Sequence, residues 1–410
     1  MLMRGAGFLS SFLISRLVGP FSLGVYSATV NTAAAVVQPV LGVVSNSSTL
    51  SAVSVDRLGL RRLLMVYLCR IALALLALGV VLLCMLDFSG LGGQDSEKRA
   101  GVWAGLLFLA GFAVMAGSLF TSVASGLLAG AGQFVPLARV LCSASLLLMF
   151  CACPVVIHGG LRGALVLAIL SSCLPATLAL ILVIKLGLRF PGDASMTWEV
   201  AWQESSGHLK ASLPSMVALA LNSSTNWFCT IYLVERIYGP TSVAVIAIGM
   251  QWLTLTLMPV TSWGGMALNE LLTANAKIGR GVTSRVVARL IMRNLAVTAA
   301  VAGSMGIASG LIAKSYGLQS DGLPLVLWIN VAISLIVSVI NVMERLFICQ
   351  DRQIVWLILS AIGLFARAMV TIALLDRGLW SVPLGIALGN ALTLLLAILW
   401  GRAPKARRDA

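Results

Sequence analysis

Charged residues are scarce in this chain, and acidic ones are missing from long stretches of it. Only 10% of the 410 residues are charged and 59% are hydrophobic, whereas a soluble domain carries roughly 25% charged residues. No Asp or Glu occurs in residues 1–55 or 100–192. Because transporters that couple to cations or protons generally use a carboxylate inside a span, this absence argues against such coupling through the first half of the chain.

Residues suited to metal binding are equally few. The chain has two histidines, His158 and His208, and eight cysteines, of which only Cys151 and Cys153 are close together, at a spacing that suits no metal site. All eight cysteines lie in apolar stretches, where a thiol packs as a small hydrophobe. We therefore expect no metal and no cofactor. No outside loop exceeds the hairpin at residues 87–101, which leaves no room for a catalytic domain outside the membrane, so we also expect no catalytic residues and that the protein is not an enzyme.

Long apolar runs make up most of what is present. The mean hydropathy is +1.00, so we expect a polytopic membrane protein. Lys and Arg number 28 against 14 acidic residues, which gives a net charge of +14. On a soluble protein this excess would suggest nucleic acid, but here the cations stand between apolar runs, where they set topology and contact lipid headgroups. The expected partners are membrane lipids, with no nucleic acid.

One pattern of residues occurs twice, 220 positions apart. The run Arg16-Leu17-Val18-Gly19-Pro20 returns as Arg236-Ile237-Tyr238-Gly239-Pro240. The same offset joins Pro39 to Pro259, Arg57 to Lys277 and Gln133 to Gln353. We interpret this as a duplicated module whose two copies run in the same direction, a parallel repeat about an axis along the membrane normal.

The apolar runs predict an all-α, polytopic membrane protein with twelve transmembrane helices in two six-helix bundles related by that repeat. We place the N-terminal bundle at residues 1–186, the C-terminal bundle at 211–401 and a basic cytoplasmic tail at 402–410. Residues 187–210 are predicted to form an amphipathic linker at the membrane interface, because Trp198 and Trp202 are four apart and share a helical face.

The orientation follows from the loops. We count 19 Lys and Arg on the side of the two termini and 7 on the opposite side, so the positive-inside rule places both termini in the cytoplasm. The first span is short, because Arg4 and Arg16 bound it. By the 220 offset the first copy lacks the opening residues of the second, so either the start is late or this span is trimmed.

Two arginines, Arg70 and Arg367, lie well inside apolar runs. A charge at mid-bilayer costs about 2.5–3.5 kcal/mol on insertion scales, so such residues usually face a bundle interior or a wet cavity. A guanidinium suits phosphate, although Arg70 is close enough to its span end to snorkel. Arg289 and Arg293 could line a cationic vestibule on the cytoplasmic side and also bind phosphate, or they could serve as topology determinants alone.

Uncharged polar side chains also occur inside the predicted spans. The amides among them are Asn31, Gln38, Asn46, Asn222, Asn226, Gln251 and Asn330. Asn31 and Gln251 share the repeat offset, so they should lie at corresponding depths. We predict that Asn31, Gln251 and Asn222 line a polar cavity and bond substrate hydroxyls, with helix–helix hydrogen bonding as the alternative. Pro39 and Pro259 are predicted hinges, because proline breaks the helical hydrogen-bond ladder.

The Arg-x-x-Gly-Pro boundary followed by Ser22-Leu23-Gly24-Val25-Tyr26-Ser27, the Gly-Ala-Gly-Gln turn at 130–133 and the twelve spans resemble Wzx-type polysaccharide (O-antigen) flippases. That family shares a superfamily with multidrug extruders and lipid II flippases. The resemblance implies alternating-access transport of an undecaprenyl-diphosphate-linked oligosaccharide across the cytoplasmic (inner) membrane, with a polysaccharide polymerase and chain-length machinery as further partners. The N-terminal stretch common in the family is missing, and the linker between the halves is modest.

Three other readings stay open. A cation-coupled multidrug exporter of the same superfamily would need carboxylates in the first bundle. A membrane enzyme of polysaccharide assembly, a polymerase or ligase, would be expected to carry a long external loop. A structural scaffold would not require duplication and buried arginines. The residues do not distinguish which glycan is carried, or whether an ion or the membrane voltage drives the step.

Overall fold

The computed structural model describes residues 2–54, 60–88, 97–188, 198–211, 213–262, 270–271, 280–318, 322–350 and 352–402. Within these ranges the chain is helical and holds no β-strand. This confirms the predicted all-α class. The predicted tail, apart from Arg402, and the basic loops around Arg57 and Lys277 lie outside the described residues.

The first group of helices runs to the second copy of the repeated motif. It comprises α1 (Leu2–Leu17), α2 (Pro20–Ser54), α3 (Leu60–Phe88), α4 (Glu97–Gly130), α5 (Phe134–Leu188), α6 (Trp198–Ala211), α7 (Leu213–Trp227), the π-helical turn η2 (Phe228–Tyr232) and α8 (Leu233–Tyr238). The remainder comprises α9 (Pro240–Ser262), α11 (Arg280–Ile307), α12 (Ser309–Tyr316), α13 (Leu323–Cys349), α14 (Gln353–Leu374), the 3₁₀ turn η3 (Leu375–Arg377) and α15 (Ser381–Arg402).

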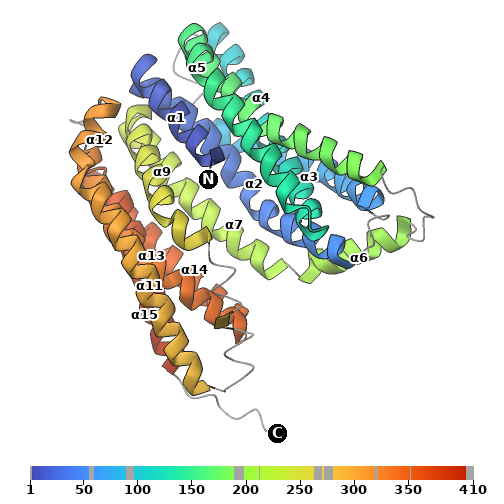
Figure 1. Cartoon of the computed structure of the whole chain (residues 1–410). Coiled ribbons are helices and arrows are strands. Elements are labelled where there is room, and N and C mark those ends of the chain that lie inside the picture. The colour runs from blue at the N-terminus through green and yellow to red at the C-terminus, as the bar shows by residue number, and fades with distance from the viewer. Residues whose placement is uncertain are drawn as a thin grey trace. The chain divides into compact units, whose positions relative to one another are not determined.

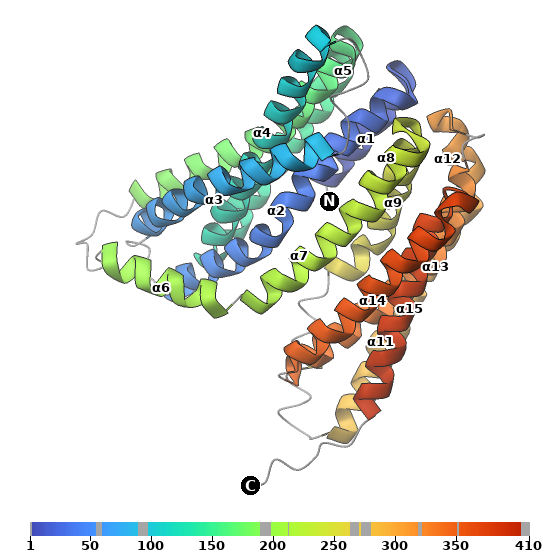
Figure 2. The ribbon, with the colours of Figure 1, turned by 180° about the vertical axis from the view of Figure 1, so that it is seen from behind.

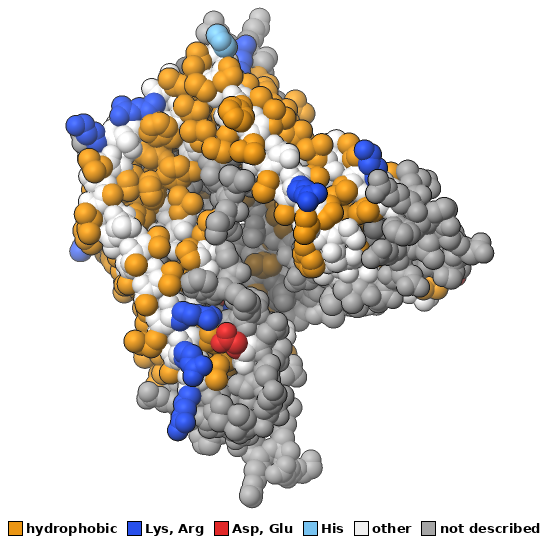
Figure 3. Space-filling view, viewed as in Figure 1, with side chains coloured by type: hydrophobic (Ala, Val, Ile, Leu, Met, Phe, Trp, Pro, Cys, Tyr) orange, Lys and Arg blue, Asp and Glu red, His pale blue; other side chains and the backbone are white. Residues whose placement is uncertain are grey.

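The helices account for the twelve predicted spans. Nine segments of the described chain are long and apolar enough to cross a membrane. One of them, 134–186, holds two spans, because Gly160 breaks α5 with a φ of 54°. The run of α7, η2 and α8 and the short apolar helix α1 supply the other two. Apolar side chains accordingly cover most of the described surface in Figure 3.

The repeat is visible in the helix boundaries. Four pairs of helix starts keep the 220 offset within one residue: Pro20 and Pro240, Leu60 and Arg280, Phe134 and Gln353, and Leu161 (after the break at Gly160) and Ser381. Gly19 and Gly239, which precede the two prolines, both have positive φ, 107° and 80°. Glycine is required there because an L side chain rarely adopts this conformation. The duplication therefore extends from sequence to backbone geometry.

By their contacts the residues form two compact units, Met1–Ala244 and Val245–Ala410. We call them unit 1 and unit 2. The α7–η2–α8 run lies in unit 1, whereas the repeat assigns it to the second copy. Sequence repeat and compact units thus divide the chain at different places, and the predicted bundle limits at 186 and 211 follow the repeat.

In unit 1, α2 is the central helix and packs against α3, α4, α6 and α7 (Figure 1). Small residues let α4 approach it closely. A Cβ on Gly126 would lie 2.7 Å from the carbonyl oxygen of Ser45, and one on Gly130 would lie 2.6 Å from the Cβ of Ala52. Membrane helices use such small residues because van der Waals packing, rather than water exclusion, holds them together.

In unit 2, α15 packs against both α13 and α14, and α11 packs against α13 (Figure 2). Leu253, Ile333 and Ile386 form one apolar core between α9, α13 and α15. Asn294 donates from Nδ2 to the carbonyl oxygen of Ser338 at 3.4 Å, so a buried amide joins α11 to α13. Such amides are the helix–helix connectors expected in a membrane bundle.

Replacing Gly126 by Leu should destabilise unit 1, because overpacking a close contact costs about 1–3 kcal/mol. Thermal unfolding of the detergent-purified chain measures the effect. Gly105→Leu is the matched control on the same helix, since no atom lies within 4 Å of a Cβ there. Equal unfolding temperatures for the two variants would contradict the close α2–α4 packing.

Candidate functional site

Arg70 lies on α3 and its guanidinium is held by the linker helix α6. Its Nη2 donates to the carbonyl oxygen of Trp202 at 2.8 Å and to the Oγ of Ser206 at 2.6 Å. The Trp202 ring covers the guanidinium, with 4.2 Å between Cζ and the ring centroid. This is the contact that snorkelling to an interfacial helix requires, and a role for Arg70 in phosphate binding stays a prediction.

Arg367 lies in unit 2 and is the only charged side chain that is buried among the described residues, at 6% exposure. It projects from α14 towards α15, where a Cβ on Gly389 would lie 2.8 Å from the Cβ of Arg367. The glycine therefore makes room for the arginine. A charge placed so deeply in a membrane bundle is a functional candidate by default, because its insertion is costly.

Arg289 and Arg293 are both exposed on α11. Arg293 pairs with Glu270 at 3.5 Å between Nη1 and Oε1, with side chains 40% and 44% exposed. An exposed pair of this kind contributes about 0–1 kcal/mol. Of the four predicted phosphate ligands, Arg70 thus belongs to unit 1 and the other three belong to unit 2.

The polar spans of unit 1 meet where α7 packs on α2. A Cβ on Gly42 would lie 2.9 Å from Leu219, and the indole Nε1 of Trp227 donates to the Oγ1 of Thr32 at 2.9 Å. From the first contact to the second, the residue number falls on α2, from 42 to 32, and rises on α7, from 219 to 227, so the two helices are antiparallel. Their spacing places Gln38 at about the level of Asn222.

The amides beside this contact share one side of the helix pair. Asn31 precedes the contact residue Thr32 by one position, and Asn226 likewise precedes Trp227. Two antiparallel helices are related by a two-fold axis perpendicular to both of them. This axis relates the residue that precedes the contact residue on one helix to the residue that precedes it on the other, so both residues lie on the same side of the pair. Gln38 lies seven residues after Asn31 and Asn222 lies four before Asn226, so each joins its neighbour's face.

We call Asn31, Gln38, Asn222 and Asn226 the amide face. The first three are exposed, although Asn31 lies about 16 Å along α2 from Pro20, near the middle of a ~30 Å hydrocarbon core. An amide moved from water to hydrocarbon without a partner costs about 2–7 kcal/mol. The side of α2 and α7 that carries these amides must therefore meet water or other polar groups.

The other predicted site residues are placed less distinctly. Gln251 is half-buried on α9 in unit 2, whereas its repeat counterpart Asn31 is exposed. Pro39 and Pro259 lie inside the continuous helices α2 and α9. Their roles, cavity lining for Gln251 and hinge movement for the two prolines, stay predictions.

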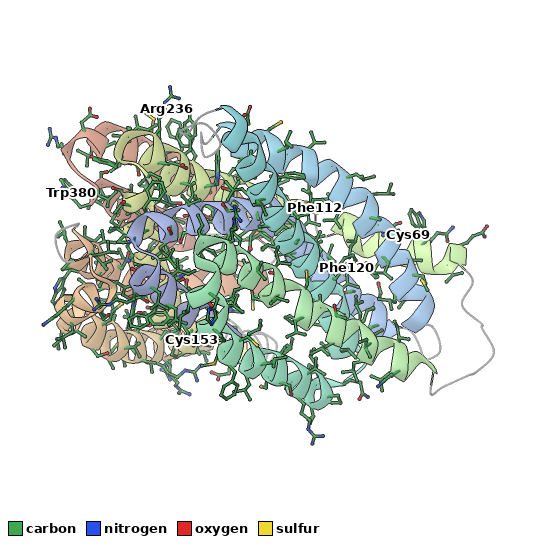
Figure 4. All side chains as sticks on the ribbon, turned by 90° about the horizontal axis from the view of Figure 1, so that it is seen from above. Cys69, Phe112, Phe120, Cys153, Arg236 and Trp380 are labelled. Atoms are coloured by element: carbon green, nitrogen blue, oxygen red, sulfur yellow. The ribbon has the colours of Figure 1, made fainter. Side chains whose placement is uncertain are left out.

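Two groups near the π-helical turn had no counterpart among the predicted site residues. Trp227 and Phe228 stack on Tyr232, with ring centroids 5.8 and 5.5 Å apart, and Arg236 donates from Nη1 to the Tyr232 hydroxyl at 2.6 Å. Arg236 is labelled in Figure 4. Beside it, Glu235 is half-buried, and its buried Oε2 has no hydrogen-bond partner in the described part of the chain.

Glu235 belongs to unit 1, in which residues 1–55 and 100–192 contain no carboxylate. The available sequence signal was its place one residue before the repeated arginine. Across the described ranges, no three His, Cys, Asp or Glu side chains are grouped as a metal site would require.

Neither a protein-family model nor a curated protein sequence matches the chain. Solved structures do match it. An inward-facing multidrug resistance MATE family transporter of the MOP superfamily aligns with a TM-score of 0.68 and 16% identity, over 98% of this chain and 94% of that one. The lipid II flippase MurJ, in an inward closed conformation, aligns with a TM-score of 0.70 and 13% identity, over 98% and 86%. At such identities the likeness establishes a shared fold, that of membrane transporters.

The amide face can be tested with cysteines placed at Asn31, Gln38 and Asn222 in a cysteine-free background. A water-soluble maleimide should modify these thiols rapidly, because the thiolate that reacts forms in water. Leu76→Cys and Phe150→Cys are controls whose native side chains are 72% and 79% exposed but apolar; they should react at least tenfold more slowly. Equal protection of all five positions would contradict a wet amide face.

Proposed function

We propose that the protein is a transporter that moves a polyprenyl-diphosphate-linked oligosaccharide from the cytoplasmic to the outer leaflet of the inner membrane. The observation that carries the proposal is the amide face on α2 and α7: three of its four amides are exposed inside the predicted spans, and Asn31 lies near mid-membrane depth. The fold shared with a lipid II flippase supports the same class of substrate.

A glycan needs such a surface. Each sugar hydroxyl that enters hydrocarbon without a partner costs about 2–7 kcal/mol. An amide offers two donors and an acceptor, so a row of them exchanges hydrogen bonds with successive hydroxyls. The lipid tail stays in the bilayer while the headgroup follows the polar side of the helices.

The diphosphate is assigned to arginines. Arg367 is buried, and Arg70, Arg289 and Arg293 lie nearer to the predicted cytoplasmic ends of their spans. Guanidinium groups form bidentate hydrogen bonds to phosphate oxygens. Moving an anion outward from a negative interior gains about 2.3 kcal/mol per charge per 100 mV.

Alternating access would come from rocking of the two repeat copies, with bends at Pro39 and Pro259 and polar contacts from Gln251 as well as from the amide face. Both termini would lie in the cytoplasm. A polysaccharide polymerase and its chain-length machinery would receive the product.

Replacing Arg367 by Ala should reduce surface polysaccharide at matched protein level by about tenfold or more, because a charged hydrogen bond contributes about 1.5–3 kcal/mol. Arg367→Lys should be intermediate, since it keeps the charge and loses the planar fork. The double variant Asn31→Ala, Asn222→Ala should also impair export. Arg377→Ala, at an exposed cation of the same unit, is the control, and unimpaired export by Arg367→Ala would remove this residue from the mechanism.

A second candidate is a cation-coupled multidrug exporter, and Glu235 favours it. This carboxylate lies in unit 1 with a buried, unpartnered oxygen among the described residues, and MATE transporters share the fold. A carboxylate in a span is the usual group for a coupling cation or proton.

If the protein is a multidrug exporter, its expression should raise the resistance of the host cells to cationic aromatic drugs at least fourfold. Glu235→Gln should abolish that gain, because it removes the charge at nearly constant volume. Glu199→Gln, at an exposed glutamate, should have no effect. Growth inhibition across a drug panel decides, and no resistance from the unaltered chain would eliminate this candidate.

A further inference from the structure

The contact between Arg70 and α6 leaves a positive charge incompletely matched. The two acceptors of Nη2, the Trp202 carbonyl and the Ser206 hydroxyl, are both neutral. Nη1 is buried and has no hydrogen-bond partner in the described part of the chain. Among the described residues, no carboxylate forms an ion pair with Arg70.

Arg70 also lies at a particular depth. The apolar span of α3 begins at Leu63, so Arg70 is about 10 Å along the helix from that end, at 1.5 Å per residue. An arginine reaches back from this depth towards the headgroups. The helix α6 packs against both α2 and α3. Figure 4 shows Cys69, the residue before Arg70, beside α6.

The surface of α6 at this point suits a membrane interface. Trp202 is 39% exposed and Val200 is 49% exposed, and tryptophan is enriched where the hydrocarbon meets the headgroups. The Ser206 hydroxyl donates to the carbonyl oxygen of Trp202 at 2.7 Å. It can turn instead to an incoming oxygen, because a hydroxyl rotates to suit its partners.

These observations define a group of hydrogen-bond donors that suits an anion. A phosphate oxygen could take the place of the Trp202 carbonyl on Nη2 while a second oxygen accepts from Nη1, the bidentate geometry that guanidinium favours. Ser206 would supply a third donor. The indole over the guanidinium excludes water from one face, which strengthens the remaining electrostatic contacts.

We propose that Arg70, Ser206 and Trp202 form a binding site for the phosphate of a membrane lipid at the cytoplasmic interface, with α6 as its movable wall. Two lipids carry this chemistry: bulk anionic phospholipid and the polyprenyl-diphosphate substrate. If the substrate is the source, this is where it loads before its glycan reaches the amide face. That last step rests on the proposed function, whereas lipid-phosphate binding does not.

Native mass spectrometry of the full chain measures the lipid it retains. The probes are polyprenyl diphosphate, phosphatidylglycerol and zwitterionic phosphatidylcholine, each added alone. Arg70→Ala should lower the retention of phosphate-bearing anionic lipid by about tenfold or more, because it removes charged hydrogen bonds. Arg70→Lys and Ser206→Ala should weaken it less. Arg139→Ala, at an exposed cation on α5, is the matched control.

Each outcome decides something. Loss confined to polyprenyl diphosphate identifies the substrate lipid as the ligand, and loss of both anionic lipids identifies a general phosphate site. Unchanged retention in Arg70→Ala, or in Arg70→Lys and Ser206→Ala if the alanine variant does not fold, overturns the site. Retention that depends on Arg70 in a chain that exports no glycan would overturn the proposed function and leave the site. Impaired glycan export with unchanged lipid retention in Arg70→Ala would overturn the lipid site and leave the proposed function.

Discussion

A polar side chain inside a bilayer must have a partner, and much of this structure follows from that requirement. Many buried hydroxyls meet it by donating to a carbonyl oxygen of their own helix, as Thr29 does to Val25, and others bond across a seam between helices. The hydroxyl of Tyr67 on α3 is 2.6 Å from Ser47 and 3.1 Å from Ser51 on α2, and Asn330 donates to the carbonyl oxygen of Gly249 at 2.9 Å. Three members of the amide face, Asn31, Gln38 and Asn222, depart from this rule, because their side chains remain exposed inside the predicted spans. Their partner is therefore outside the helices, and water or substrate is what fits.

The two copies of the repeat share their backbone geometry and differ at the positions of the two arginines inside the spans. The counterpart of Arg70 in the second copy is Leu290, which is fully buried, and the counterpart of Arg367 in the first is Leu147, which is 52% exposed. Helix starts and positive-φ glycines are kept between the copies. Backbone geometry is thus shared, whereas each arginine belongs to one copy. Under the proposed function, the two copies would therefore contact different parts of one substrate.

The linker helix shows how far sequence reasoning could reach. The four-residue spacing of Trp198 and Trp202 predicts an amphipathic interfacial helix, and α6 covers 198–211. For Arg70 the sequence allowed two roles, snorkelling to the interface or lining a cavity, because the depth of a residue in its span does not distinguish between them. The structure places its guanidinium against α6, 132 residues further along the chain. Glu235 was not among the predicted site residues for a related reason: the repeat places it in the second copy, whereas its helix lies in unit 1.

Membrane class, helix limits and the repeat could all be read from the residue order, because hydropathy and the backbone preferences of glycine and proline act over short distances. The amide face could not be read in the same way. Asn31 and Asn222 were recognisable as polar residues in spans, but their common side depends on the antiparallel contact between Thr32 and Trp227, 195 residues apart. Contacts of that range arise from side-chain packing between helices, and packing is a property of the folded chain that no local pattern encodes.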